Sequence, residues 1–281
     1  VTHEAAQAWL MDFLNHRFPD FGRYEDAIVR DELILHHSLL SPLLNIGLLE
    51  PEPVLQAVLQ HAERNDIPLA SLEGLIRQLI GWREFIRLIY VRQGRTQRTR
   101  HYWTFNNPVA PSFYNGTTGI APIDQTIGKV WQQAYCHHIE RLMILGNYFL
   151  LLETNPDAVY QWFMEMYIDA YDWVMVPNVV GMALHADGGR MATKPYAAGG
   201  NYIDKMSDYC RGCRYDRKQR TGDDACPYTT LYWDFLARHE QRFARNPRIV
   251  QQVRAAQRLS DLPAVRERAV EVLRRLDAGT L

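Results

Sequence analysis

The chain has 281 residues, 47% of them hydrophobic and 22% charged, with a formal net charge of −1. These proportions are typical of a globular protein, and the length allows one large domain or two small ones. No uninterrupted apolar run approaches the roughly eighteen residues of a membrane-spanning helix. The first residues, Val1 to Glu4, lack the basic and apolar regions of a signal peptide. We therefore expect a cytoplasmic protein with no membrane contact.

Helical spacing of apolar residues dominates the chain, and no alternating run predicts a sheet, so the expected fold class is all-α. The apolar stripes fall at residues 9–18, 55–59, 75–89, 123–145 and 159–173. Glycine and proline cluster in residues 94–122 and 177–229, which predicts long, irregular connections of a kind that often carries function. We expect residues 1–245 to form the main domain and residues 246–281 an arginine-rich helical extension.

A basic segment follows the third stripe. Its arginines are Arg92, Arg95, Arg98 and Arg100, and the aromatic pair Tyr102 and Trp103 comes just after them. Basic and aromatic side chains together suit the backbone and bases of a nucleic acid. A solvated loop with scattered arginines explains the same pattern.

The first candidate site is the segment 37–47. Ser41 followed by Pro42 has the order of an N-cap and a first helical residue. The start of a helix presents unpaired N–H groups, and the hydroxyl groups of Ser38 and Ser41 add donors, so a diphosphate would be held well there. A capped helix without a ligand is the alternative.

The second candidate is the pair Arg83 and Glu84, which sits between apolar neighbours. At least one of the two charges is expected to point inward, where it must be paired or bind a ligand. An internal ion pair would satisfy that requirement as well as a ligand would.

The third candidate is His137, His138 and Arg141. If residues 123–145 form one helix, His138 lies on the same face as Trp131 and Leu145, with Arg141 next to it. Such a group could place proton donors in a cavity. A histidine that is merely satisfied within the core is the alternative.

The fourth candidate comprises Asp169, Asp172 and Asn178, at the end of an aromatic stripe and in the turn beyond it. Asp169 could pair with Arg141 if the two helices pack together. The aromatic residues of the stripe are themselves expected to be core.

The fifth candidate is a metal site formed by Cys210, Cys213 and Cys226. Three cysteines at this spacing in a reducing compartment favour an iron–sulfur cluster or another metal over a disulfide. The fourth ligand is not evident, because the remaining cysteine, Cys136, lies beside the histidine pair. Zinc completed by a histidine or an aspartate is the competing interpretation.

Together these segments resemble the photolyase/cryptochrome family, and most closely its bacterial iron–sulfur (6-4) branch. The resemblance covers roughly residues 3–245. The motifs that carry it are FGRYEDA (21–27), HSLLS (37–41), WREF (82–85), HHIERLM (137–143), GNYIDKMSDYC (200–210) and YWDF (232–235).

The resemblance implies that the chain is the FAD-binding catalytic helical domain of this family. The cofactor-binding residues that it implies are Tyr24, Ser38, Leu39, Leu40, Ser41, Asn45, Arg83, His138, Arg141, Asp169, Asp172 and Asn178. Arg141 and Asp169 resemble the ion pair beside the isoalloxazine ring.

The resemblance also implies light-driven repair of UV-damaged DNA, of the (6-4) type, by a monomer. His138 matches the proton-donating histidine with His137 beside it, Tyr196 and Tyr202 match the lesion pocket, and Trp162 matches an electron-relay position. Two alternatives remain: a short flavoprotein that binds single-stranded DNA or RNA without repair, and a cryptochrome-like light receptor.

The sequence departs from the family in two respects. Family members carry an N-terminal α/β antenna domain that has no counterpart here, so we expect a short photolyase-like protein or a fragment. The first cysteine of the cluster is replaced by Pro122, and Cys136 lies fourteen residues further on, about 21 Å along a helix. The iron–sulfur cluster is therefore left open, with three candidate cysteine ligands.

Overall fold

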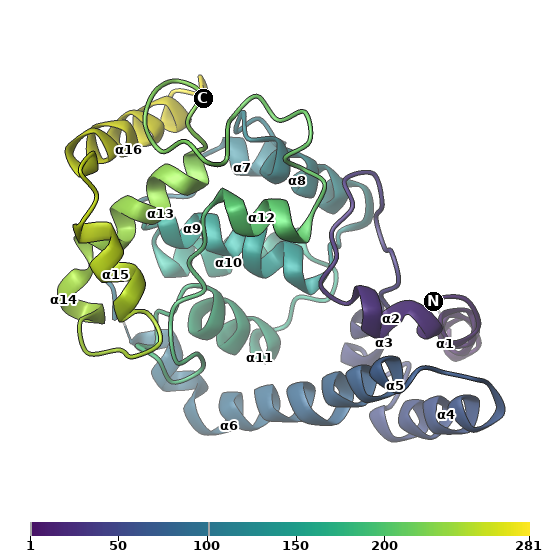
Figure 1. Ribbon diagram of the computed structural model, residues 1–281. Helices are drawn as coiled ribbons and strands as arrows, with labels where there is room; N and C mark the ends of the chain where they lie inside the picture. Colours follow the sequence, from purple (N-terminus) through teal and green to yellow (C-terminus); the bar gives the residue numbers. More distant parts are fainter. Residues whose placement is uncertain (1, 101) are drawn as a thin grey trace.

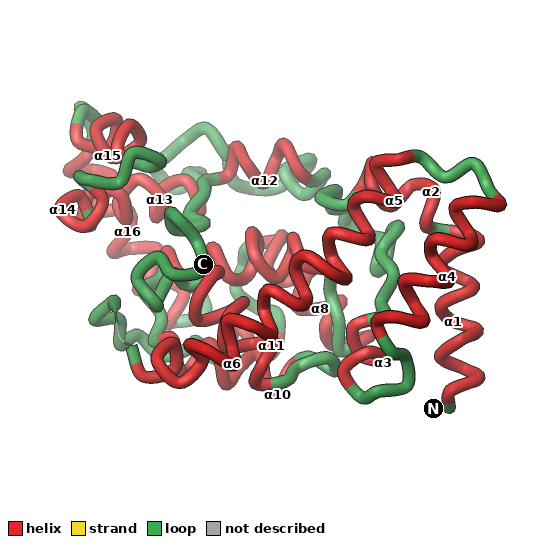
Figure 2. The backbone as a smooth tube through the Cα atoms, turned by 90° about the horizontal axis from the view of Figure 1, so that it is seen from below, coloured by secondary structure: helices red, strands yellow, loops and turns green. Residues whose placement is uncertain are grey.

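The computed structural model describes residues 2–100 and 102–281, and it confirms the all-α fold class (Figure 1). Figure 2 shows helices joined by loops, and among the described residues pairing of the β type is limited to isolated bridges such as Ile28 with Ser207. The helices are α1 (His3–His16), α2 (Phe18–Tyr24), α3 (Ser41–Asn45), α4 (Pro51–Arg64), α5 (Leu69–Ile76), η1 (Arg77–Trp82), α6 (Arg83–Thr99), α7 (Ser112–Asn115), α8 (Ala121–Gln133), η2 (Glu140–Gly146), α9 (Asn147–Leu151), α10 (Pro156–Met166), α11 (Asp172–Met175), η3 (Val176–Ala183), α12 (Gly200–Met206), α13 (Pro227–Arg238), α14 (Glu240–Phe243), α15 (Val250–Gln257) and α16 (Leu262–Asp277).

The buried apolar side chains form two clusters. The smaller cluster belongs to α1–α5 and η1, and it is centred on Phe13 and Phe18, which are fully buried. In Figure 1 these helices form a lobe at the right, from which α6 runs toward the rest of the molecule. Full burial of one such phenylalanine contributes about 1.5–3 kcal/mol. The small lobe therefore has a core of its own.

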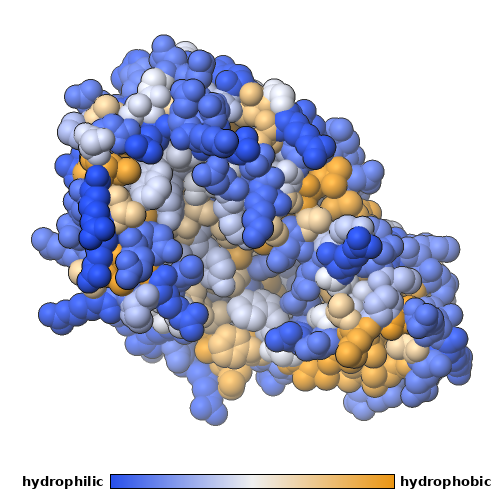
Figure 3. All heavy atoms as spheres, viewed as in Figure 1, coloured by the Kyte–Doolittle hydropathy of each residue, from blue (hydrophilic) through white to orange (hydrophobic). Residues whose placement is uncertain are grey.

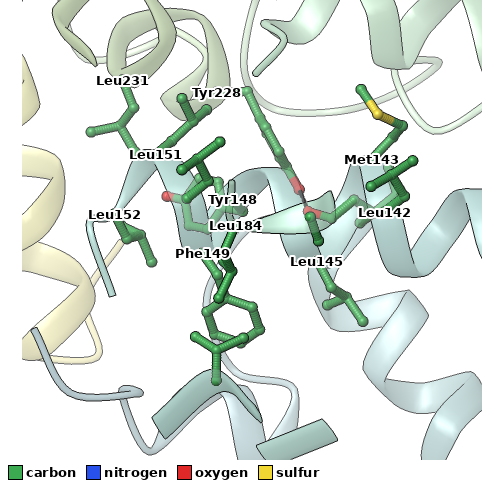
Figure 4. Close-up of a cluster of buried hydrophobic side chains, with 14 of the residues drawn as sticks. Leu142, Met143, Leu145, Tyr148, Phe149, Leu151, Leu152, Leu184, Tyr228 and Leu231 are labelled. Atoms are coloured by element: carbon green, nitrogen blue, oxygen red, sulfur yellow. Dashed lines mark hydrogen bonds between the residues drawn. The ribbon is translucent and has the colours of Figure 1, made fainter. Parts of the chain in front are cut away.

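The larger cluster holds the remaining helices together around α9 and η2. Figure 4 shows its centre, where the rings of Tyr148 and Tyr228 lie 4.7 Å apart. The Tyr228 hydroxyl donates a hydrogen bond of 2.8 Å to the Ile144 carbonyl, so its one polar group is satisfied within the core. The helices that build the cavity described below are thus fixed on a rigid base.

The C-terminal helices α15 and α16 pack on α13 and contribute Val253, Val272 and Leu276 to the larger cluster. Residues 246–281 therefore share a core with the preceding helices. The boundary between the two apolar clusters lies near residue 80, where η1 leads into α6.

The prediction of one helix across residues 123–145 is wrong. Helix α8 ends at Gln133, and Ala134 takes a left-handed conformation with φ of +50°. The Ala134 N–H closes the helix on the Val130 carbonyl at 2.7 Å, so the chain changes direction before His137. Trp131 is consequently 67% exposed and shares no face with His138. The basic segment is also less irregular than predicted, since α6 continues to Thr99.

Three helical segments have the wider turns of a π-helix: η1, η2 and η3. Such turns are rare and occur frequently at functional sites. The spacing of apolar residues along the chain does not predict these wider turns. None of the described helices combines the length and the apolarity needed to cross a bilayer.

Candidate functional site

A cavity with about 1210 Å³ of empty space, part of it open to solvent, lies between the two apolar clusters. Figure 3 shows a hollow on this face between the lobe of α1–α5 and the rest of the molecule. All three π-helical segments contribute to its wall. The predicted cofactor-binding residues that line it are Ser38, Leu39, Leu40, Ser41, His138, Arg141, Asp169 and Asn178.

The segment before α3 enters the cavity in a constrained conformation. Leu35 and Leu39 both have positive φ values, of 50° and 53°, and neither is a glycine. Such conformations cost on the order of 1–3 kcal/mol each and persist only where the surrounding structure holds them. Since Leu39 lines the cavity, the strain falls on the wall of the candidate site.

Ser41 has a different role from the predicted N-cap. The N-cap position of α3 is Leu40, and the Ser41 hydroxyl donates a 2.7 Å hydrogen bond to Asp169 Oδ2. Ser41 is the first residue within α3, which has no side-chain cap, and its hydroxyl proton is directed to a charged acceptor on another segment. Ser41 therefore joins the small lobe to the larger cluster.

Arg141 and Asp169 form the predicted ion pair, with Nη1 and Oδ1 2.9 Å apart and both side chains largely buried. Arg141 Nε also donates to the Cys136 carbonyl at 2.7 Å, and the guanidinium lies 4.3 Å from the centre of the Tyr167 ring. Burial opposes the charge, but Asp169 outweighs it and the pKa of Arg141 is raised. Arg141 Nη2 is buried and has no partner, so it can bind a ligand in the cavity.

Two histidines, His37 and His138, line the cavity, and His137 packs against His37. The rings of His37 and His137 stack at 4.4 Å with an interplanar angle of 11°. Burial lowers the pKa of His37 and of His138 to about 4, with neighbouring positive charge as the second cause, and it lowers the pKa of His137 further. Part of His138 is nevertheless exposed, and the residue lies on the cavity wall, where a ligand can reach it. All three imidazoles are therefore neutral at pH 7.

A buried ion pair lies behind the histidines. Lys129 Nζ is 2.7 Å from Glu140 Oε1 and 2.9 Å from the Val29 carbonyl oxygen, and both charged side chains are almost fully buried. The second oxygen of Glu140 lies 3.5 Å from His137 Nε2, and neither atom has a hydrogen-bond partner. The pair of Lys129 and Glu140 was not predicted from the sequence. The position of Glu140, three residues after His137, was the one local signal for a carboxylate near the histidines.

Asn178 is held at the cavity wall by two hydrogen bonds. Its amide nitrogen donates to the Val174 carbonyl at 2.8 Å, and its oxygen accepts from Trp82 Nε1 at 3.3 Å. Trp82 also lines the cavity. Other lining residues that were not predicted are Asp26, His37, Gln78, Tyr135 and Phe163.

Asn45 and Arg83 do not line the cavity but support its wall. Asn45 Nδ2 donates to the Asp169 backbone oxygen at 3.0 Å, and Arg83 Nη1 donates to Asn45 Oδ1 at 3.0 Å. Arg83 is half-buried, and the acceptors that it binds within the protein are the neutral Asn45 amide oxygen and Leu44 carbonyl. The predicted internal ion pair is therefore not formed by Arg83. Glu84 is exposed and pairs with Arg87.

The structure does not bring Asp172 to the cavity. Its carboxylate accepts hydrogen bonds from Tyr90, Tyr160 and Arg98, so it links α11 to α6 and α10. Tyr24 is likewise absent from the cavity wall, and its ring stacks on His36 at 5.2 Å.

The predicted catalytic tyrosines and tryptophan lie beyond the cavity wall. The pKa of Tyr202 is raised by burial and then by the charges of Asp26 and Tyr196, which places these side chains in one neighbourhood. Trp162 is fully buried, and its ring centre is 5.1 Å from that of Phe163, which lines the cavity. One aromatic ring thus separates Trp162 from the cavity.

The cysteines do not complete a metal site. Cys210, Cys213 and Cys226 are free thiols, and burial raises the pKa of Cys210 to about 12. Within residues 2–100 and 102–281, no group of three or more histidine, cysteine or acidic side chains is placed to hold a metal ion. Cys136 Sγ lies 3.2 Å from the Tyr167 hydroxyl, on the side of Arg141, and Pro122 is buried in the first turn of α8. These residues do not fit a four-cysteine cluster.

Solved structures with a similar fold define the class of this domain. A bacterial class III photolyase from Agrobacterium tumefaciens superposes with a TM-score of 0.62 at 18% identity, over 99% of this chain and 56% of that one. A cryptochrome from Synechocystis superposes with a TM-score of 0.56 at 20% identity, over 67% of this chain and 40% of that one. The fold is that of the helical catalytic domain of photolyases and cryptochromes.

A (6-4) photolyase from Agrobacterium fabrum is 43% identical over 279 residues, which are 99% of this chain and 55% of that protein. The chain thus spans about half the length of the relative. No protein-family model matches it. Sequence and fold together show that the chain belongs to the photolyase/cryptochrome family.

Proposed function

We propose that the chain binds FAD in the cavity and uses it in the light-driven repair of (6-4) lesions in DNA. The observation that carries the proposal is the cavity itself, whose wall holds the Arg141–Asp169 pair together with His37 and His138. The 43% identity to a (6-4) photolyase supports the same assignment.

The residues present fit FAD. Two buried polar atoms of residues that line the cavity, Arg141 Nη2 and His37 Nε2, lack a partner, and leaving such groups unsatisfied costs about 1–3 kcal/mol each. An anionic or carbonyl-bearing ligand would satisfy Arg141, and a ligand with a donor and an acceptor would satisfy His37 in either tautomer. Ser38 and the residues up to Ser41 would then hold the diphosphate, and Arg141, Asp169 and Asn178 the ring system. When bound, FAD supplies the light-driven electron transfer.

The chain contributes positioning and proton chemistry. Arg141 keeps its positive charge, because Asp169 holds its pKa high, and so favours negative charge in the cavity. Neutral His138 can donate its ring N–H to an oxygen of the lesion. A lesion flipped out of the stack would reach His138 from the side of Tyr196 and Tyr202. Flipping costs least for a base whose pairing is already broken, as in a damaged site.

The main alternative is a family member that binds flavin and a nucleic acid, single-stranded DNA or RNA, without repairing it. A light receptor is the third possibility, which the similarity to a cryptochrome structure favours. We do not assign an iron–sulfur cluster, because the cysteines do not fit one. We propose that the protein acts as a monomer in the cytoplasm.

One purified sample tests these possibilities. We expect a yellow protein with flavin absorption that removes (6-4) lesions from an oligonucleotide under blue light and not in the dark. The variant His138→Ala should retain flavin and lose repair. A colourless protein that takes up no FAD would refute the whole proposal, whereas a yellow protein without repair would leave a binding protein or a receptor.

A further inference from the structure

A second pocket lies beside the segment that follows η3, and we call it the arginine pocket. Its empty space is about 1010 Å³, including the opening to solvent. The residues that matter here are Tyr102, His185, Thr193, Arg242, Arg245 and Arg248. It is close to the first cavity, because Ala183 lines that cavity and His185, two residues on, lines this pocket. Their Cα atoms are at most about 7.6 Å apart.

The charge of the arginine pocket is unbalanced. No acidic residue lines it among those the structure describes, and no described salt bridge involves Arg242, Arg245 or Arg248. Arg242 donates to the Tyr102 carbonyl at 2.9 Å and stacks 5.0 Å from its ring, so only neutral groups bind it. By contrast, the nearby Arg238 is paired with both Glu153 and Asp234. Three guanidinium groups without a counter-ion favour an anionic ligand.

The pocket is preformed by a rigid loop. Asp187 is fully buried and accepts hydrogen bonds from the N–H groups of Gly189 and Met191 and from Gln97 Nε2. Both of its oxygens are therefore bound within the loop, and neither accepts a hydrogen bond from the side chains of Arg242, Arg245 or Arg248. Gly188 has φ of +73°, and a Cβ atom there would lie 2.7 Å from the Tyr102 ring.

Two features tie the pocket to a ligand near the first cavity. Asn246 Nδ2 donates to the Thr193 carbonyl at 2.8 Å, and this joins the arginine-bearing turn to the loop that reaches Tyr196 three residues later. His185 is 4% exposed, and its buried Nδ1 has no hydrogen-bond partner. The arginine-bearing turn is thus hydrogen-bonded to the loop that carries the lesion-side tyrosine, Tyr196.

We propose that the arginine pocket binds a phosphate group, and that this phosphate belongs to the backbone of the nucleic-acid strand whose damaged base enters the first cavity. Phosphate contacts fix the register of a strand without reading its sequence. The choice of a strand rests on the proposed function, whereas the phosphate chemistry does not. Free inorganic phosphate is the other source of the same group.

The test uses an undamaged fluorescein-labelled oligothymidylate in the dark, so it requires neither flavin nor repair. Arg245 and Arg248 are exposed, and their guanidinium groups form no hydrogen bond or salt bridge with the described residues. The variant Arg245→Gln/Arg248→Gln should therefore leave the fold intact. The matched control is Arg254→Gln/Arg258→Gln, which removes two exposed charges from α15 and its end, outside the pocket. Fluorescence anisotropy is measured over a range of salt concentrations.

Each phosphate contact on a single strand contributes about 0.7 to the slope of log K against log salt. We therefore expect the pocket variant to lose the one phosphate contact, which is about 0.7 of the slope, and to bind about 5-fold more weakly at 0.1 M salt. The control should change both quantities much less. Equal losses in the two variants would overturn the proposal, since they would show an effect of net charge alone.

A titration with inorganic phosphate separates the two sources. If the strand is the ligand, phosphate at millimolar concentration should compete weakly with the oligonucleotide for the unmodified protein and not for the pocket variant. Loss of phosphate binding with unchanged oligonucleotide binding would overturn the assignment to a strand. Because no lesion is present, neither result depends on whether the protein repairs DNA.

Discussion

The substitution Lys129→Met tests the buried charges behind the histidines. It removes the partner of a carboxylate that is fully buried and 2.7 Å from the ammonium group. Breaking a buried pair in this way costs about 3–5 kcal/mol, because one charge is left unpaired in the interior. The Val29 carbonyl also loses its donor. We expect a loss of about 3 kcal/mol or more in the free energy of unfolding at pH 7.5.

The loss should depend on pH. Burial already raises the pKa of Glu140 above its usual 4.5, and without Lys129 it rises further. A carboxyl group whose pKa is higher in the folded state destabilises that state as pH rises above the unfolded value, by about 1.4 kcal/mol per pH unit. The variant should therefore lose about 2–3 kcal/mol less at pH 5 than at pH 7.5, measured by urea unfolding at both values.

The double variant Lys129→Met/Glu140→Gln is the control. It removes both charges, so it should recover much of the stability at pH 7.5 and lose the added pH dependence. If Lys129→Met were equally destabilised at pH 5 and pH 7.5, Glu140 would not be an ionised buried group, and this reasoning would be refuted.

Three further outcomes follow from the site. Asp169→Ala leaves Arg141 without its counter-ion and should cost about 3–5 kcal/mol in urea unfolding and release FAD. Asp169→Asn removes the same charge but keeps one acceptor oxygen for Arg141 and should cost less; equal losses would show that this hydrogen bond adds nothing beyond the charge. Because the pKa of His37 is lowered to about 4, its contribution to stability is present above about pH 6.5 and is lost as pH falls toward 4, by up to about 3 kcal/mol. The variant His37→Gln should therefore show a flatter profile of unfolding free energy against pH in that window. An unchanged profile would contradict the burial of a neutral ring. Purified protein should contain little iron, because the described cysteines form no group that could hold a metal ion; stoichiometric iron in anaerobically purified protein would contradict this.

Much of the site could be predicted from sequence because its residues fall in compact motifs. Ser38–Ser41, His138 and Arg141 were found in this way, and the pairing of Arg141 with Asp169 is confirmed. The all-α class followed from the spacing of apolar residues alone. A local pattern suffices for the motifs and for the fold class, whereas the pair of Arg141 and Asp169, 28 residues apart, was expected from the resemblance and from the packing of two helices.

The errors arose where tertiary contacts override local pattern. Ser41 has the sequence of an N-cap, but it lies within the helix and its hydroxyl donates to a carboxylate 128 residues away. The stripe around Trp131 looks continuous, but Ala134 turns the chain. Asp172 is bound by residues of α6 and α10, which no local motif reveals. The pairing of Lys129 with Glu140 is likewise non-local and could be seen only in three dimensions.

The cavity lies between the two apolar clusters, so a molecule that fills it contacts both at once. Phe21 of α2 and Leu75 of α5 form one side, and Leu142 and Met182 the other. A ligand that binds only when the two halves are together lowers the frequency with which they part. Amide hydrogens of α2 and α5 should then exchange with deuterium more slowly once the cavity is filled, while those of α16 should not change. The cofactor would serve as a cross-link between the lobes as well as the source of the chemistry.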